Sequence, residues 1–157
     1  MSSLQPAVAA IQDELNARGF DITVQELPSS TRTAAEAAAT LNCEVGAIGN
    51  SLVFMADSEP LLVLASGAAR VDTKVLKQQL GKSKIKSATP EQVLEITGQA
   101  VGGVSPLGHT HSMPAVIDVD LKNYETIWVA AGSPNAVFPV TFNELAQIAN
   151  AQPLAVR

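Results

Sequence analysis

The chain has 157 residues, a single cysteine and a formal net charge of −5. This length suits one domain with a well-buried core, and one cysteine cannot form an internal disulfide. Hydrophobic residues make up 46% of the sequence and charged residues 16%, which excludes a disordered chain. No apolar run reaches the roughly 18 residues of a membrane span, and the stretch before Arg18 lacks the basic residues of a signal peptide. We therefore expect one domain over 1–157, located in the cytoplasm.

Helix signals are clear along the chain. Residues 5–18 carry Val8, Ile11 and Leu15 on one helical face. Four further helices are predicted to begin at the capping residues Thr33, Asp72, Thr89 and Thr141, and three of these are followed three positions later by Glu or Gln. Strands rich in Val, Ile and Leu are predicted at 22–25, 47–55, 61–66, 115–118, 127–131 and 136–140. The pattern indicates a mixed sheet with helices, in the α/β or α+β class.

Basic residues cluster on an otherwise acidic chain. No acidic residue occurs between Thr73 and Pro90. The cluster consists of Arg70, Lys74, Lys77, Lys82, Lys84 and Lys86. Such a patch can contact a phosphate backbone while the other faces repel it, although a solvated helix and turn is the simpler interpretation.

The common catalytic motifs are absent. The sequence has no CxxC, HExxH, phosphate-binding loop or GxGxxG. The segment around Ser105 is not a nucleophile elbow, which argues against a serine hydrolase. His109 and His111 could bind a metal only with a third ligand, and none stands at short spacing. We expect no metal and no cofactor.

Two glycine-rich segments remain, at 98–109 and 131–136. Glycine permits a positive φ and close backbone approach, while proline stiffens a turn. Loops of this kind can aim amide N–H groups at a ligand oxygen, as in an oxyanion hole. Ordinary turns are the alternative.

Five segments, in order, resemble the YbaK-type editing domains associated with prolyl-tRNA synthetase. They are Thr33-Ala-Ala-Glu-Ala-Ala, Ser51-Leu-Val-Phe54, Leu61-Leu-Val-Leu64 with Arg70-Val-Asp72, the loop 102–108, and 128–138. The resemblance covers about 30–140 and implies a compact fold with a curved mixed sheet surrounded by helices. It also implies hydrolysis of the ester that joins a wrong, small amino acid to the 3′ end of a tRNA.

The resemblance also suggests the site. A loop from Gly102 to Pro106 would hold the aminoacyl group through backbone amides, and a ribose hydroxyl of the substrate would help to place the attacking water. Asn50 and Gly102 are the candidate catalytic residues. The candidate substrate-binding residues are Ser51, Gly103, Val104, Ser105, Pro106, Gly108, His109, Gly132, Ser133 and Asn135, and the pocket-size candidates are Leu27, Leu52, Phe54 and Val104. The resemblance also favours the interpretation of the basic cluster as a tRNA contact.

Two positions depart from the family pattern. Asn50 stands where the family commonly has lysine, and Asn135 where it often has histidine. Amides form hydrogen bonds but carry no charge. Three hypotheses follow: a deacylase acting in trans, a catalytically silent module that binds tRNA or a nucleotide, and a metal-assisted hydrolase. The expected partners are aminoacyl-tRNA and an aminoacyl-tRNA synthetase, with no DNA and no membrane.

Overall fold

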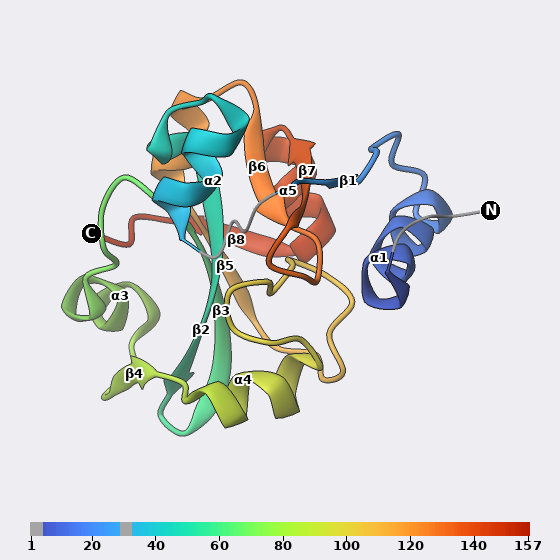
Figure 1. The fold of residues 1–157 in the computed structure, drawn as a ribbon. Helices are drawn as coiled ribbons and strands as arrows, with labels where there is room; N and C mark the ends of the chain where they lie inside the picture. Colours follow the sequence, from blue (N-terminus) through green and yellow to red (C-terminus); the bar gives the residue numbers. More distant parts are fainter. Residues whose placement is uncertain (1–4, 29–32) are drawn as a thin grey trace.

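The computed structural model describes residues 5–28 and 33–157 (Figure 1). Within these residues the chain forms an eight-stranded mixed sheet with five α-helices around it. The elements in chain order are α1 (Pro6–Ala17), β1 (Gln25–Glu26), α2 (Ala34–Leu41), β2 (Ile48–Ala56), β3 (Glu59–Ser66), α3 (Thr73–Leu80), β4 (Ile85–Ser87), α4 (Pro90–Thr97), β5 (Ala115–Asp118), β6 (Ile127–Ala130), β7 (Ala136–Val140), α5 (Phe142–Ala149) and β8 (Ala151–Leu154). Short 3-10 turns precede β2 (Val45–Ala47) and follow β5 (Val119–Asn123). The predicted fold class is confirmed.

Local capping explains where the helices begin. Thr33, Thr89 and Thr141 each accept a hydrogen bond from the backbone N–H three residues on, and the Glu or Gln side chain there accepts one from the N–H of the capping residue. Asp72 caps α3 by accepting from the backbone N–H groups of Lys74 and Val75. These bonds satisfy donors that a helix leaves free at its first turn, so the four predicted starts are confirmed.

The long β2–β3 hairpin organises the sheet. The order is β1-β7-β6-β2-β3-β5-β8, and β4 pairs with β2 outside this path. Strand β3 is buried on both faces: Leu62 and Leu64 belong to the larger hydrophobic core, while Leu61 and Val63 belong to a second core beside α3. Figure 1 shows the hairpin running through the middle of the molecule, with α2, α3 and α4 around it and α1 to one side.

The N-terminal strand is shorter than predicted. Ile22 and Val24 are buried as expected, but only Gln25–Glu26 pairs, with β7. The side chain of Gln12 replaces a strand partner: its Nε2 donates to the Ile22 carbonyl and its Oε1 accepts from the Val24 N–H, each at 2.8 Å. This contact ties α1 to the segment that follows it.

Two strands were not predicted. β4 adds to β2 through Ile85–Ser87, within the basic segment, and β8 adds to β5 in parallel through Ala151–Leu154. Both are short edge strands with mostly exposed side chains, so neither carries a hydrophobic alternation that would reveal it.

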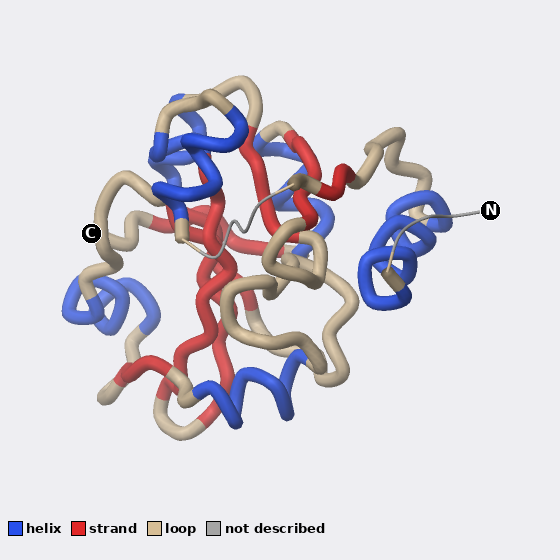
Figure 2. The backbone as a smooth tube through the Cα atoms, viewed as in Figure 1, coloured by secondary structure: helices blue, strands red, loops and turns tan. Residues whose placement is uncertain are grey.

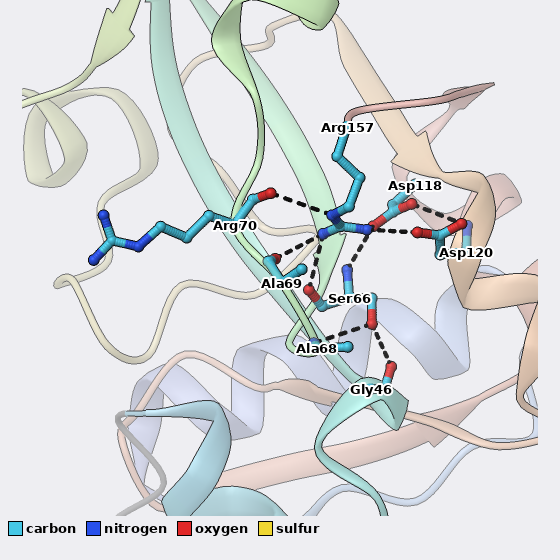
Figure 3. Close-up of polar contacts among 8 residues, drawn as sticks. All are labelled: Gly46, Ser66, Ala68, Ala69, Arg70, Asp118, Asp120 and Arg157. Carbon is cyan, nitrogen blue, oxygen red and sulfur yellow. Dashed lines mark hydrogen bonds and ion pairs between the residues drawn. The ribbon is translucent and has the colours of Figure 1, made fainter.

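A buried ion pair fastens the end of the chain to the sheet (Figure 3). Arg157 Nη1 lies 2.7 Å from Asp118 Oδ2, and the Asp118 side chain is 1% exposed. Arg157 also donates to the backbone carbonyls of Ser66, Ala69 and Arg70. Because Asp118 Oδ2 accepts from the Ser66 N–H as well, this network holds together the ends of β3 and β5.

Candidate functional site

A gap in the β2 ladder creates the main cavity. On the side away from β3, β2 pairs with β6 only at Ile48 and Gly49, and with β4 only from Phe54 onward. Between these two partners, Asn50 to Val53 have no strand beside them; there, the Ala88 N–H donates to the Val53 carbonyl. The cavity of about 380 Å³ lies along this stretch.

Walls from distant parts of the chain enclose the cavity. The lining residues are Thr33, Ala34 and Ala37, the β2 run 48–54, Ser87, Ala88 and Val93, Val101, Gly102 and Val104, and finally Trp128, Val129, Ala130 and Val137. None of these side chains carries a charge. Small and branched apolar groups dominate, so the cavity suits a small ligand that is recognised through neutral polar atoms.

The two glycine-bearing turns meet beside this cavity. The Gly132 N–H donates to the Gly103 carbonyl at 2.9 Å. A Cβ placed on Gly103 would lie 2.7 Å from the Ser133 carbonyl carbon, so only glycine permits this approach. Figure 2 shows the long connection between α4 and β5 beside the shorter one between β6 and β7. The two turns therefore fold toward each other.

Buried polar side chains fix the shape of the longer loop. Gln99 Oε1 accepts from the Ser105 N–H at 2.7 Å, and Gln99 Nε2 donates to the Leu107 carbonyl at 3.1 Å. The Ser105 hydroxyl also bonds the Leu107 carbonyl. Nothing in the sequence marks Gln99 for this role, because no local pattern distinguishes a glutamine that folds back onto its own loop.

Four of the predicted site residues line the cavity: Asn50, Ser51, Gly102 and Val104. Among the pocket-size candidates, Leu52 and Phe54 also line it, and Leu27 does not. The side chain of Asn50 forms no hydrogen bond with another described residue, and the backbone N–H groups of Gly102 and Val104 form none either. Polar groups from two different segments therefore lie at one cavity without a hydrogen-bond partner among the described residues.

The remaining predicted substrate-binding residues are not among the described residues that line the cavity. They are Gly103, Ser105, Pro106, Gly108, His109, Gly132, Ser133 and Asn135. Asn135 accepts from the Ser133 hydroxyl at 2.8 Å and donates to the Leu27 carbonyl at 3.2 Å. Its side-chain amide is therefore engaged in holding the turn.

The two histidines lie apart from the cavity lining. His111 is exposed, and His109 Nε2 donates to the Ser105 carbonyl at 2.7 Å. In the described ranges, 5–28 and 33–157, no three His, Cys, Asp or Glu side chains form a group that could hold a metal ion. Burial lowers the pKa of His109, against smaller opposing effects of the Ser105 hydrogen bond and the Glu14 charge.

This lowered pKa predicts a pH dependence of stability. The unfolded chain binds a proton at His109 more readily than the folded chain does, so stability falls as pH drops below about 6.5, the ordinary histidine pKa. His109→Gln should therefore lose less stability than the wild type between pH 7.5 and pH 5.5 in urea unfolding. His111→Gln is the control and should follow the wild type; equal pH profiles for all three proteins would contradict the prediction.

Five of the six predicted tRNA contacts are exposed, Lys77 is half-buried, and part of the basic cluster adjoins the cavity lining in the chain. Lys84 and Lys86 are exposed at β4, and the residue after Lys86, Ser87, lines the cavity. Lys74, Lys77 and Lys82 surround a shallow hollow at α3, and Arg70 is exposed nearby in the chain. The Asp57 carboxylate accepts from the backbone N–H groups of Ser83 and Lys84, which fixes the turn that carries these lysines and lowers the pKa of Asp57.

Comparison with known proteins decides the family. Residues 28–148 match the aminoacyl-tRNA editing domain family. The chain belongs to this family. A solved structure of a proposed trans-editing enzyme for prolyl-tRNA synthetase is similar over 99% of both chains, with 43% identity and a TM-score of 0.92. The match confirms the resemblance found in the sequence.

Relatives of known sequence include both short and long proteins. YwhH of Bacillus subtilis (strain 168), described as uncharacterized, is 35% identical over 125 residues, 79% of each chain. A proline–tRNA ligase of Nitratidesulfovibrio vulgaris (strain Hildenborough) is 33% identical over 110 residues, which are 69% of this chain and 19% of the ligase. This editing domain therefore corresponds to a small part of the ligase. Within the described residues, no helix has the length and hydrophobicity that a bilayer span requires.

Proposed function

We propose that this editing domain, residues 1–157, acts in trans as a deacylase that hydrolyses the ester between a mismatched small amino acid and the 3′ end of a tRNA. One observation carries the proposal: the described lining of a cavity of about 380 Å³ carries no charge, and it includes the Asn50 side chain and the Gly102 N–H, which have no hydrogen-bond partner among the described residues. Such a cavity suits an acyl group, while the ester requires only a positioned water and a stabilised oxyanion.

The proposed chemistry uses backbone and amide groups. The N–H groups of Gly102 and Val104 and the side-chain amide of Asn50 are the candidate donors to the ester carbonyl. Water attacks that carbonyl carbon, the resulting oxyanion accepts these hydrogen bonds, and the 3′ oxygen of the tRNA leaves with a proton. No side-chain nucleophile is needed, because an aminoacyl ester is already activated.

The approach of the tRNA follows the charge distribution. Lys84 and Lys86 lie close in the chain to the cavity-lining Ser87, whereas the rest of the chain is acidic overall. Phosphates of the acceptor stem would lie along β4 and α3, and the 3′ end would enter the cavity.

The direct test is release of amino acid from a panel of mischarged tRNAs. The proposal predicts turnover of at least one tRNA charged with a small amino acid, and a loss of activity in Asn50→Ala. A silent binding module is the second candidate, favoured by Asn50 in place of the family's lysine. Measurable tRNA binding without turnover of any substrate would establish that candidate and reject the deacylase.

Charge reversal tests the basic surface. Lys82→Glu with Lys84→Glu should weaken tRNA binding and reduce the slope of log Kd against log salt by about one unit for each phosphate that the variant no longer neutralises. Lys122→Glu is the control, because Lys122 is exposed outside the basic cluster. An unchanged salt slope in the double variant would remove this surface from the proposed function.

A further inference from the structure

The hydrogen-bonding direction alternates along β2 and singles out Ser51. In an antiparallel pair, successive residues point their N–H and C=O groups to opposite sides. The Ile48 carbonyl accepts from the Gly67 N–H on the β3 side, whereas the Val53 carbonyl accepts from the Ala88 N–H on the other side. Odd-numbered residues therefore direct their backbone groups away from β3.

Ser51 is the odd-numbered residue between the last β6 pair, at Gly49, and the Val53–Ala88 bond. Its backbone N–H and C=O thus face the cavity at the point where the ladder has no partner strand. Its neighbours Asn50 and Leu52 direct theirs toward β3, where Ala65 and Val63 lie opposite.

The side chain of Ser51 also lacks a partner. Its hydroxyl oxygen is buried and has no hydrogen-bond partner among the described residues, and because Ser51 lines the cavity, a rotation about χ1 would bring this hydroxyl to a ligand there. A buried hydroxyl without a partner costs free energy, and a ligand that completes the bond recovers that cost. One residue therefore offers two oxygen acceptors to a ligand, the carbonyl directly and the hydroxyl after its side chain rotates toward the cavity.

We infer that Ser51 binds the α-amino group of the aminoacyl substrate through these two oxygens. The inference rests on the proposed function and deepens it. An amino group is the part of an aminoacyl ester that supplies N–H donors, and the described lining, which has no carboxylate, can recognise it only through neutral acceptors. The ester carbonyl needs donors instead, which the Gly102 side of the cavity supplies.

The division of roles explains how a cavity without carboxylates selects an aminoacyl ester. An acyl group that lacks the amino group leaves both Ser51 oxygens unpaired, and a site with unpaired buried polar groups rejects such a ligand. Ser51 is a specificity residue in this account, and it takes no part in bond breaking.

Binding of stable analogues tests the inference separately from catalysis. The probes are 3′-amino-3′-deoxyadenosine carrying either an alanyl or a propionyl amide, which differ only in the amino group. Trp128 lines the cavity and is the one tryptophan in the sequence, so its fluorescence reports binding. Affinities are compared for the wild type, Ser51→Ala and, as matched control, Ser87→Ala, a second serine among the described residues that line the cavity.

The wild type should bind the alanyl probe more tightly than the propionyl probe. Ser51→Ala should reduce this preference by about three- to tenfold, the effect of one hydrogen bond, mainly by weakening the alanyl probe. Its thermal stability should be unchanged or higher, because the substitution removes an unpaired hydroxyl. Ser87→Ala should keep the wild-type preference.

An unchanged preference in Ser51→Ala, or an equal weakening of both probes, would overturn the inference and leave the deacylase proposal standing. Failure of the wild type to bind either probe, together with no turnover of any mischarged tRNA, would instead reject the proposed function and the inference with it.

Discussion

Arg157→Ala is expected to lower the free energy of unfolding by about 3–5 kcal/mol, because it leaves a buried carboxylate without its partner. The Asp118 side chain is 1% exposed, and Arg157 Nη1 lies 2.7 Å from it (Figure 3). The variant also releases the carbonyls of Ser66, Ala69 and Arg70 that Arg157 bridges. Urea or thermal unfolding measures the loss, which corresponds to roughly 2–4 °C in Tm for each kcal/mol.

Asp120→Ala is the matched control for this ion pair. Asp120 lies at the same 2.7 Å from Arg157 Nη1, but its side chain is 51% exposed. An exposed pair contributes less than about 1 kcal/mol, so the control should remain close to the wild type. Equal losses in the two variants would show that burial of Asp118 does not determine the strength of this contact.

Gly103→Ala is expected to separate the two glycine-bearing turns. The new methyl group would lie 2.7 and 2.8 Å from the Ser133 carbonyl carbon and Cα, which are backbone atoms that cannot rotate away. Overpacking of this kind costs about 1–3 kcal/mol. Misplacement of the loop that carries Gly102 should lower deacylation by about a hundredfold, measured in single-turnover reactions at a temperature where the variant remains folded.

Gly81→Ala controls for the general cost of replacing a glycine. Gly81 ends α3 with φ +65°, and nothing lies within 4 Å of its would-be Cβ. Alanine there should cost about 1 kcal/mol through backbone strain and leave deacylation unchanged. Comparable activity losses in Gly103→Ala and Gly81→Ala would indicate that stability alone, and not the meeting of the turns, accounts for the effect.

The helices were predictable because their signals are local. Thr33, Thr89 and Thr141 each form a capping box with a residue three positions away, and no tertiary contact is needed to form it. The prediction of a strand at Ile22 and Val24 was wrong for the opposite reason. The backbone groups of these residues bond to the side chain of Gln12, which lies on another element, and not to a neighbouring strand. Burial was predicted correctly there, but pairing was not.

The site was predictable only in part. Asn50 and Gly102 line the cavity as expected, because the family resemblance places their segments together. The cavity itself comes from the interruption of the β2 ladder between β6 and β4, and β4 carries no hydrophobic signal in the sequence. The side chains of Ser105 and Asn135 form hydrogen bonds within their own loops. No spacing rule in the sequence reveals these bonds.

The central claim is that water, placed by main-chain and amide groups, hydrolyses the ester without a side-chain nucleophile or a metal. The most direct measurement is single-turnover deacylation of the best mischarged tRNA, with and without a chelator, with the protein followed by intact-mass spectrometry. The account predicts the same rate with chelator and no acylated protein at any time. A transient acyl adduct, or activity abolished by chelator and restored by a metal ion, would contradict it.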